Sequence, residues 1–191
     1  RTFVLAVDVK NAFSTTSREA QLFELKRIGE EGGIWRYSES TYQNTWTVLK
    51  AGKRYSKLIK EDKGSKQGGI KSATDYKSYN RPLYDMITAS NLGIEEQGTS
   101  YGSIMVADDG LSLLGKLEDL RQVSKLYTAF SDQYSVQFCF DKTIINVIGT
   151  DEDRRELHTS NIKIGGVSPN FDSQSLQPGG TATVPKSLEG K

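Results

Sequence analysis

The chain has 191 residues, and its 25 Lys and Arg against 24 Asp and Glu give a formal net charge of +1. This length suits one domain and is short for two independent cores. Hydrophobic residues make up 36% and charged residues 26% of the chain, which predicts a globular protein without a membrane span. The near-zero net charge excludes a uniformly basic nucleic-acid binder.

Cysteine and histidine each occur once, as Cys139 and His158. One cysteine excludes an intrachain disulfide and a zinc site built from several thiolates. One histidine and one cysteine, far apart in sequence, leave little basis for Ser-His-Asp or Cys-His catalysis. The chain opens on Arg1 without a charged-then-apolar leader, so we expect an excised piece of a longer sequence. Sparse cysteine favours an intracellular compartment, nucleus or cytoplasm.

The first third of the chain predicts a strand, a helix and a hairpin. Residues 3–9 are a nearly continuous β-prone apolar run, which predicts a strand buried on both faces. Residues 18–28 carry apolar side chains at helical spacing, which predicts a short surface helix. Residues 45–60 hold two β-rich stretches around Ala51-Gly52, which predict a hairpin.

The remaining pattern completes an α+β fold, an antiparallel sheet backed by helices. Beyond Thr150 the pattern decays, so we assign residues 1–150 to the domain and 151–191 to short strands and a flexible Gly/Pro/Ser-rich tail. The elements predicted in between are a helix over 72–90 that Pro82 should kink or divide, two strands over 103–114 around Asp108-Asp109-Gly110, an amphipathic helix over 117–134, and a hairpin of 136–140 with 143–148.

Two acidic positions interrupt apolar runs. Asp8 ends the first strand, and Asp108 ends a later one with Asp109 beside it. If those two strands are neighbours, the carboxylates meet at one end of the sheet, where oxygen ligands suit Mg²⁺ or Mn²⁺. Each position also has an ordinary explanation, because Asp108-Asp109 alone fits a solvated turn and Asp8 alone fits a salt-bridged strand end.

Three motifs, in this order along the chain, resemble those of the palm of reverse transcriptases. The resemblance is strongest to the enzymes of non-LTR retrotransposons and group II introns. The motifs are Asp8-Val-Lys-Asn-Ala-Phe13, Lys63-Gly-Ser-Lys-Gln67-Gly68-Gly-Ile-Lys-Ser72, and Val106-Ala-Asp108-Asp109, followed by Phe138-Cys-Phe-Asp-Lys142-Thr. The resemblance runs from about residue 2 to residue 149. It implies a right-hand polymerase palm, with the fingers upstream and the thumb downstream largely absent.

The resemblance also implies roles for single residues. Asp8 and Asp108 would carry two catalytic metal ions, Mg²⁺ or Mn²⁺, with Asp109 as the third carboxylate. Such metal ions activate a hydroxyl and stabilise a phosphoryl leaving group. Val106 stands where the family usually has an aromatic residue, and Ser14 replaces a frequent acidic residue after Ala-Phe.

Four further positions match the family's substrate-binding and proton-transfer positions. Phe13 would be the steric gate that crowds a ribose 2′ hydroxyl, Gln67 and Gly68 would line the incoming nucleotide and template, and Lys142 would donate a proton to departing pyrophosphate. The ordinary alternatives are a core aromatic, a Gly-rich turn and a solvated lysine.

Positive charge is concentrated in one segment. Residues 50–71 carry a local balance of +6 and the remainder carries −5, so the overall +1 is a cancellation. A solvated hairpin face explains these lysines, and so does a surface that neutralises template phosphates. The aromatic residues Trp35, Tyr37, Tyr42 and Trp46 fit a base-stacking platform, although we expect them to pack the helix and hairpin. The four candidate nucleic-acid contacts are Lys53, Arg54, Lys63 and Lys66.

Together these observations predict an RNA-directed DNA polymerase core that uses an RNA template, a DNA primer and deoxynucleoside triphosphates, without a membrane partner. One alternative is a degenerate, non-catalytic palm that binds nucleic acid or assembles with partners. The other is an RNA-templated RNA polymerase, against which Phe13 argues, because a large ring at that position would exclude ribonucleotides.

Overall fold

The computed structural model describes residues 1–66, 68–106, 108–166 and 168–171. Gln67 and the Gly/Pro/Ser-rich segment beyond residue 171 lie outside them. The elements in chain order are β1 (Thr2–Asp8), α1 (Ala12–Thr15), α2 (Arg18–Arg27), α3 (Gly32–Gln43), β2 (Trp46–Thr47), β3 (Lys50–Ala51), β4 (Arg54–Tyr55), β5 (Ile59–Lys60), α4 (Ser72–Ala89), β6 (Ile94–Glu96), β7 (Thr99–Tyr101), β8 (Ser103–Val106), β9 (Asp109–Leu114), α5 (Leu117–Tyr134), the 3-10 helix η1 (Phe140–Lys142), β10 (Ile144–Ile148), α6 (Asp151–Thr159) and β11 (Asn170–Phe171).

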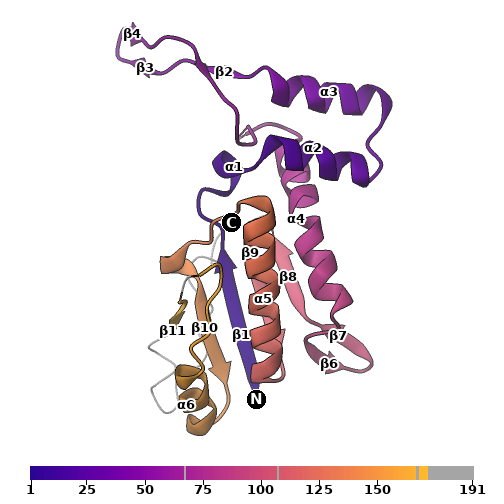
Figure 1. The fold of residues 1–191 in the computed structure, drawn as a ribbon, viewed down its shortest axis with the longest axis vertical. Coiled ribbons are helices and arrows are strands. Elements are labelled where there is room, and N and C mark those ends of the chain that lie inside the picture. The colour runs from indigo at the N-terminus through magenta and orange to yellow at the C-terminus, as the bar shows by residue number, and fades with distance from the viewer. Residues whose placement is uncertain (67, 107, 167, 172–191) are drawn as a thin grey trace.

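A five-stranded sheet forms the centre of the fold, in the order β11-β10-β1-β9-β8. All neighbours are antiparallel except β10 and β11, which are parallel. Helices α4 and α5 pack against one face of the sheet, while α2 and α3 lie beyond one end of it (Figure 1). The α+β class predicted from the sequence is therefore confirmed.

The core fills the space between the sheet and its helices. Strand β1 contributes Phe3, Leu5 and Val7, and α5 contributes Val123 and Phe130. Because side chains alternate along a strand, the intervening residues of β1 point to the opposite face, where they are only partly buried. The prediction that this strand is buried on both faces is thus wrong: one face is left open.

The order of the strands does not meet the condition under which Asp8 and Asp108 would meet. β1 lies beside β9 and β10, and β8, the strand that leads to Asp108, is the edge strand beyond β9. Because β8 and β9 pair across a tight turn, the start of β9 rather than the end of β8 lies against the end of β1. The acidic turn still lies at the end of the sheet where β1 ends.

The hairpin predicted for 136–140 with 143–148 is not formed. Residues 136–140 make only an isolated bridge, Val9 with Phe138, while β10 pairs along β1 from Thr2 to Ala6. The intervening 3-10 helix η1 turns the chain, and the buried Ile145 and Val147 of β10 join the core cluster. Pairing with the distant strand β1 therefore replaces the local hairpin pairing.

Two helices differ from their predicted form. Helix α4 continues through Pro82 without division, because the buried Tyr79 and Leu83 on either side anchor it to the core. Helix α2 buries a mostly polar face, in which Leu25 is the only buried apolar residue, with Arg18, Gln21 and Glu24. The spacing of the apolar residues in 18–28 did not indicate that the buried face of this helix is mostly polar.

Helix α6 was not foreseen. Thr150 caps it, with the Asp153 side chain bonded back to the Thr150 backbone, and this capping box was the available sequence signal. Within the residues that the structure describes, no helix is long and apolar enough to cross a membrane.

Candidate active site at one end of the sheet

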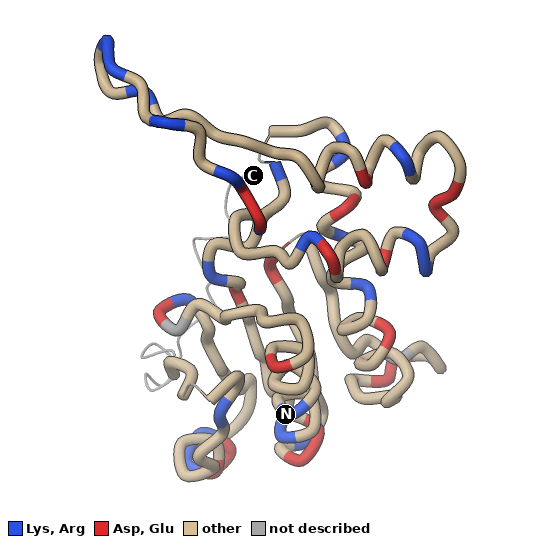
Figure 2. Tube along the Cα trace, turned by 45° about the horizontal axis from the view of Figure 1, so that its top comes forward, with Lys and Arg blue, Asp and Glu red and all other residues tan. Residues whose placement is uncertain are grey.

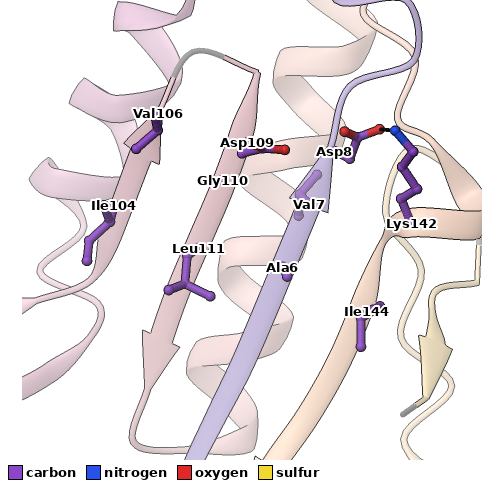
Figure 3. Close-up of a pocket in the computed structure, with 10 residues that line it drawn as sticks. All are labelled: Ala6, Val7, Asp8, Ile104, Val106, Asp109, Gly110, Leu111, Lys142 and Ile144. Carbon is purple, nitrogen blue, oxygen red and sulfur yellow. Dashed lines mark ion pairs between the residues drawn. The ribbon is translucent and has the colours of Figure 1, made fainter. Parts of the chain in front are cut away.

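Two of the candidate carboxylates are paired across neighbouring strands. Asp8 is the last residue of β1, and the antiparallel register places it opposite Asp109, the first residue of β9. Residues opposite each other in such a ladder project to the same side of the sheet. Both line one pocket on the open face (Figure 3), so the fold brings together acids about a hundred residues apart in sequence.

The third carboxylate, Asp108, lies in the turn between β8 and β9. It lines a cavity of about 510 Å³ together with Asp8. The same cavity is lined by Phe13 and Lys142. Four of the predicted site residues therefore share one cavity, and Asp109 lies in the adjoining pocket.

Lys142 contacts Asp8 from the side of β1 that faces β10. It ends η1, and its Nζ lies 3.4 Å from Oδ2 of Asp8 (Figure 3). The charge of Asp8 and its hydrogen bond to the ammonium raise the pKa of Lys142 above its ordinary value, and Asp109 adds a smaller effect. The side chain therefore stays protonated at neutral pH.

The donor set was tested for its fit to a divalent cation. Among the residues described, no group of three or more His, Cys, Asp or Glu side chains is arranged to hold a metal ion. Mg²⁺ in phosphoryl-transfer sites is usually bound by one or two carboxylates together with substrate phosphates rather than by a complete protein cage. Asp8 and Asp108 on one cavity fit that pattern, because both offer hard oxygen ligands.

Phe13 lies in the four-residue helix α1, directly beyond the end of β1. Asn11 before it adopts a left-handed conformation, with φ of 52°, which turns the chain out of the strand. The Phe13 ring is half-buried and packs against Tyr76 of α4, with 4.8 Å between ring centroids. The ring thus lies between the cavity and the core. The alternative that Phe13 is an ordinary core aromatic residue therefore accounts for only one side of the ring.

The Gly-rich segment that follows Lys63 packs against α1. The Gly64 N–H donates to the carbonyl of Thr16 at 2.8 Å, and the Ser65 N–H donates to that of Phe13 at 2.6 Å. Gly68, with φ of +80°, lines a different cavity together with Lys66 and Lys71. The structure therefore brings this loop to the site through residues 64 and 65 and places Gly68 away from the acidic cavity.

The predicted basic residues are distributed along a projecting hairpin. Strands β2 with β5 and β3 with β4 form what we call the hairpin arm, residues 46–60, which extends from the body and carries positive charge along its length and at its tip (Figure 2). Lys53 and Arg54 are exposed at its tip, whereas Lys63 and Lys66 are exposed beyond its base. The hairpin itself was predicted correctly.

The aromatic residues of this region do not pack as a group. Tyr42 is buried, as expected, but Tyr37 is 60% and Trp46 53% exposed. Tyr55 on the arm is 66% exposed, with Lys50 Nζ 5.7 Å from its ring centroid. The expectation that the aromatics pack the helix and hairpin is therefore right for Tyr42 and wrong for Trp46 and Tyr37.

Sequence reasoning missed a buried arginine that joins three segments. Arg18 donates to the carbonyls of Gly64 at 2.8 Å and Tyr42 at 3.0 Å, and to the carbonyl and carboxylate of Glu61. A cation in the first turn of a helix opposes the helix dipole. This mismatch at the start of α2 was the signal that Arg18 has a partner elsewhere.

Sequence reasoning also missed a buried ionic cluster behind the Gly-rich loop. Lys71 Nζ contacts Asp75 at 2.7 Å and Glu30 at 2.5 Å, and the Tyr42 hydroxyl donates to Asp75 at 2.7 Å. Burial acts to lower the pKa of Lys71, but the hydrogen bonds to Asp75 and Glu30 outweigh it and raise the pKa. The cluster connects α4 to α3 through Tyr42. The i,i+4 spacing of Lys71 and Asp75 was the available sequence signal, whereas nothing local indicated Glu30 or Tyr42.

The fold resembles that of telomerases. Telomerase from Candida albicans, in complex with a TWJ fragment of telomeric RNA, matches with a TM-score of 0.60 and 14% identity over 78% of this chain and 27% of that chain. Apo telomerase from Candida tropicalis matches with a TM-score of 0.62 and 12% identity, over 79% of this chain and 29% of that chain. The form of it that is truncated from the C-terminal domain matches with a TM-score of 0.61 and 14% identity, over 78% of this chain and 31% of that chain. No protein-family model and no curated protein matches the chain.

These matches establish the fold in outline. The fold of this chain is therefore similar to that of part of the telomerase chain, at an identity of 12–14%. The chain spans less than a third of the length of those telomerases.

Proposed function

We propose that this chain carries the catalytic core, the palm, of an RNA-directed DNA polymerase. The observation that carries the proposal is the acidic end of the sheet, where Asp8 lies opposite Asp109 and shares a cavity with Asp108. The motifs around these acids resemble those of reverse transcriptases, and the telomerase-like fold supports the same assignment.

In the proposed reaction, the primer 3′ hydroxyl gives its proton to solvent water, its oxygen forms a bond to the α-phosphorus of a deoxynucleoside triphosphate, and the bond from that phosphorus to pyrophosphate breaks. Asp8 and Asp108 would hold Mg²⁺ or Mn²⁺, which would supply activation of the hydroxyl and stabilisation of the leaving group. Asp109 contributes negative charge beside them. Lys142, whose Nζ lies 3.4 Å from Asp8, would donate a proton to the departing pyrophosphate.

Substrate recognition is assigned to the other candidate residues. Phe13 at the cavity would crowd a 2′ hydroxyl and so select deoxynucleotides, while Gln67 and Gly68 would line the nucleotide and template. The exposed basic residues of the hairpin arm and its base would neutralise template phosphates. Electrostatic binding of that kind weakens steeply with added salt, so a flat salt dependence would contradict this assignment.

Primer extension tests the catalytic proposal. The protein in its full native length should extend a DNA primer on an RNA template with Mg²⁺ and deoxynucleotides, and Asp108→Asn should lower the rate by about a hundredfold or more. Ser14→Ala, an exposed position in the same cavity lining, is the matched control and should retain activity. No extension by the parent, or equal extension by Asp108→Asn, would refute the proposal.

A second candidate function is a non-catalytic nucleic-acid-binding module, which the hairpin arm favours because it carries exposed positive charge along a projection from the body (Figure 2). RNA binding that survives Asp108→Asn without any extension by the parent would support it. The RNA-polymerase alternative is tested by Phe13→Val, which should raise ribonucleotide incorporation. Unchanged sugar selectivity would remove the steric-gate role of Phe13.

A further inference from the structure

The Phe13 ring is supported from behind by a residue to which no role has been assigned, Tyr76. We propose that Tyr76 is a positioning residue for sugar selection: it holds the Phe13 ring against the cavity that Asp8 and Asp108 line. This inference rests on the proposed polymerase function and names the device that would set its nucleotide specificity.

The two rings come from segments far apart in sequence. Phe13 belongs to α1 and Tyr76 to α4, and their ring planes are tilted by 31° at a centroid distance of 4.8 Å. This spacing is within the range at which aromatic pairs attract each other. Tyr76 is fully buried, whereas Phe13 is half-buried and lines the acidic cavity. Tyr76 therefore occupies the side of Phe13 that faces away from the cavity.

Tyr76 is itself held in place by a column of aromatic side chains. Its ring lies 6.0 Å from that of Tyr79, whose hydroxyl donates to the carbonyl of Tyr134 at 2.8 Å. Tyr134 in turn stacks on Phe130 at 4.7 Å. Close-packed interiors transmit displacement rather than absorb it, so the column fixes Tyr76 relative to α5.

The backbone of Phe13 is fixed by a separate device. Helix α1 has four residues, too few to be stable by itself. The bonds from Gly64 and Ser65 to the carbonyls of Thr16 and Phe13 hold it. Gly64 permits this approach because a Cβ there would lie 2.9 Å from the carbonyl oxygen of Ser14.

Sugar selection by a steric gate depends on where the ring surface lies. Contact repulsion and attraction change over a fraction of an ångström, so a ring that can retreat no longer excludes a 2′ hydroxyl. With the backbone of Phe13 fixed, retreat requires space behind the ring, and Tyr76 fills that space. Truncating Tyr76 opens a void into which the Phe13 ring can move.

The test compares kcat/KM for deoxynucleotides with that for ribonucleotides in the full-length protein. Tyr76→Leu should lower the ratio about tenfold, whereas Tyr76→Phe, which keeps the ring, should leave it unchanged. In Phe13→Val the gate is already absent, so adding Tyr76→Leu should lower the ratio no further. Leu83→Ala removes equally buried bulk from the same helix and should leave the ratio unchanged.

Each outcome bears on the proposal. If Tyr76→Leu does not fold, as judged by circular dichroism, Tyr76→Met carries the test. Methionine keeps apolar bulk in the core, but its flexible chain gives way where the rigid Tyr76 ring does not, so the ratio should still fall. If the folded Tyr76 variant extends the primer with deoxynucleotides and its ratio of kcat/KM values is unchanged, the positioning role of Tyr76 is overturned, while the proposed function stands. Absence of extension by the parent would overturn the proposed function, and this inference with it. A fall in the ratio in Leu83→Ala as large as in Tyr76→Leu would reduce the effect to general destabilisation and also overturn the role.

Discussion

Replacing Arg18 by methionine should destabilise the fold well beyond an ordinary surface change. The Arg18 side chain is 8% exposed and reaches three segments that are not adjacent in sequence, at Tyr42, Glu61 and Gly64. Methionine has similar length and no donor. The substitution therefore removes the hydrogen bonds while leaving most of the packing volume.

The magnitude follows from the acceptors left behind. The carbonyls of Tyr42 and Gly64 belong to buried residues, and an unsatisfied buried acceptor costs about 1–3 kcal/mol. The Glu61 side chain is 35% exposed, so water can replace the guanidinium there and the lost ion pair adds little. The expected loss in the free energy of unfolding is about 3 kcal/mol, near the range for breaking a buried ionic network.

Urea unfolding followed by circular dichroism measures this loss. Arg36→Met is the matched control, because Arg36 is exposed on α3, and it should change the free energy by less than about 0.5 kcal/mol. Arg18→Lys should fall between the two, since an ammonium cannot reproduce the guanidinium fork. A loss in Arg18→Met no larger than in Arg36→Met would refute the reasoning and show that water satisfies both carbonyls.

Three further predictions use other local features. Gly64→Ala should lower the free energy of unfolding in urea by about 1–3 kcal/mol, because φ of Gly64 is +89° and an added Cβ would meet backbone atoms. Gly52→Ala, at φ of +60° with open space around it, should lower it less. Equal losses in the two variants would contradict this reasoning. The hydrogen bond from Arg1 lowers the pKa of Asp153 from 3.8 to about 2. The ionised Asp153 thus stabilises the fold above pH 3.8, and this contribution is lost as pH falls toward 2. Asp153→Asn should flatten this part of the curve of unfolding free energy against pH. A curve unchanged by the substitution would contradict the prediction. Lys142→Met should remove most primer extension, because Lys142 is the proposed proton donor to pyrophosphate. Extension at the parent rate would contradict that role.

The elements that the sequence predicted best are those with a strong local period. The apolar spacing of α5 places Leu120, Val123 and Tyr127 on one face, and all three are buried. The Asp108-Asp109-Gly110 turn likewise contains its own strand-turn-strand signal. Such features are decided by residues close in sequence, so no tertiary information is needed to find them.

Residues 136–140 illustrate what local pattern leaves undecided. Their alternation suits a strand as well as that of β10 does, yet only β10 enters the sheet, beside β1. Both segments bury side chains in the core, Val136 and Phe138 as well as Ile145 and Val147. What separates them is pairing with the distant strand β1, which the local pattern does not specify. Helix α2 is a similar case. Its polar face can be buried because Glu61, Gly64 and Tyr42, which are distant in sequence, accept hydrogen bonds from Arg18.

For the candidate site, the sequence by itself determined the residue types and their order: acids at strand ends, a phenylalanine after the first, a Gly-rich loop and a later lysine. Only the tertiary structure decided that Asp8 lies opposite Asp109, that Lys142 pairs with Asp8, and that Gly68 lines a separate cavity. It also placed Tyr76 behind the Phe13 ring. The physical reason is that motif chemistry is local, whereas strand register and packing depend on contacts between residues that lie tens of positions or more apart in the chain.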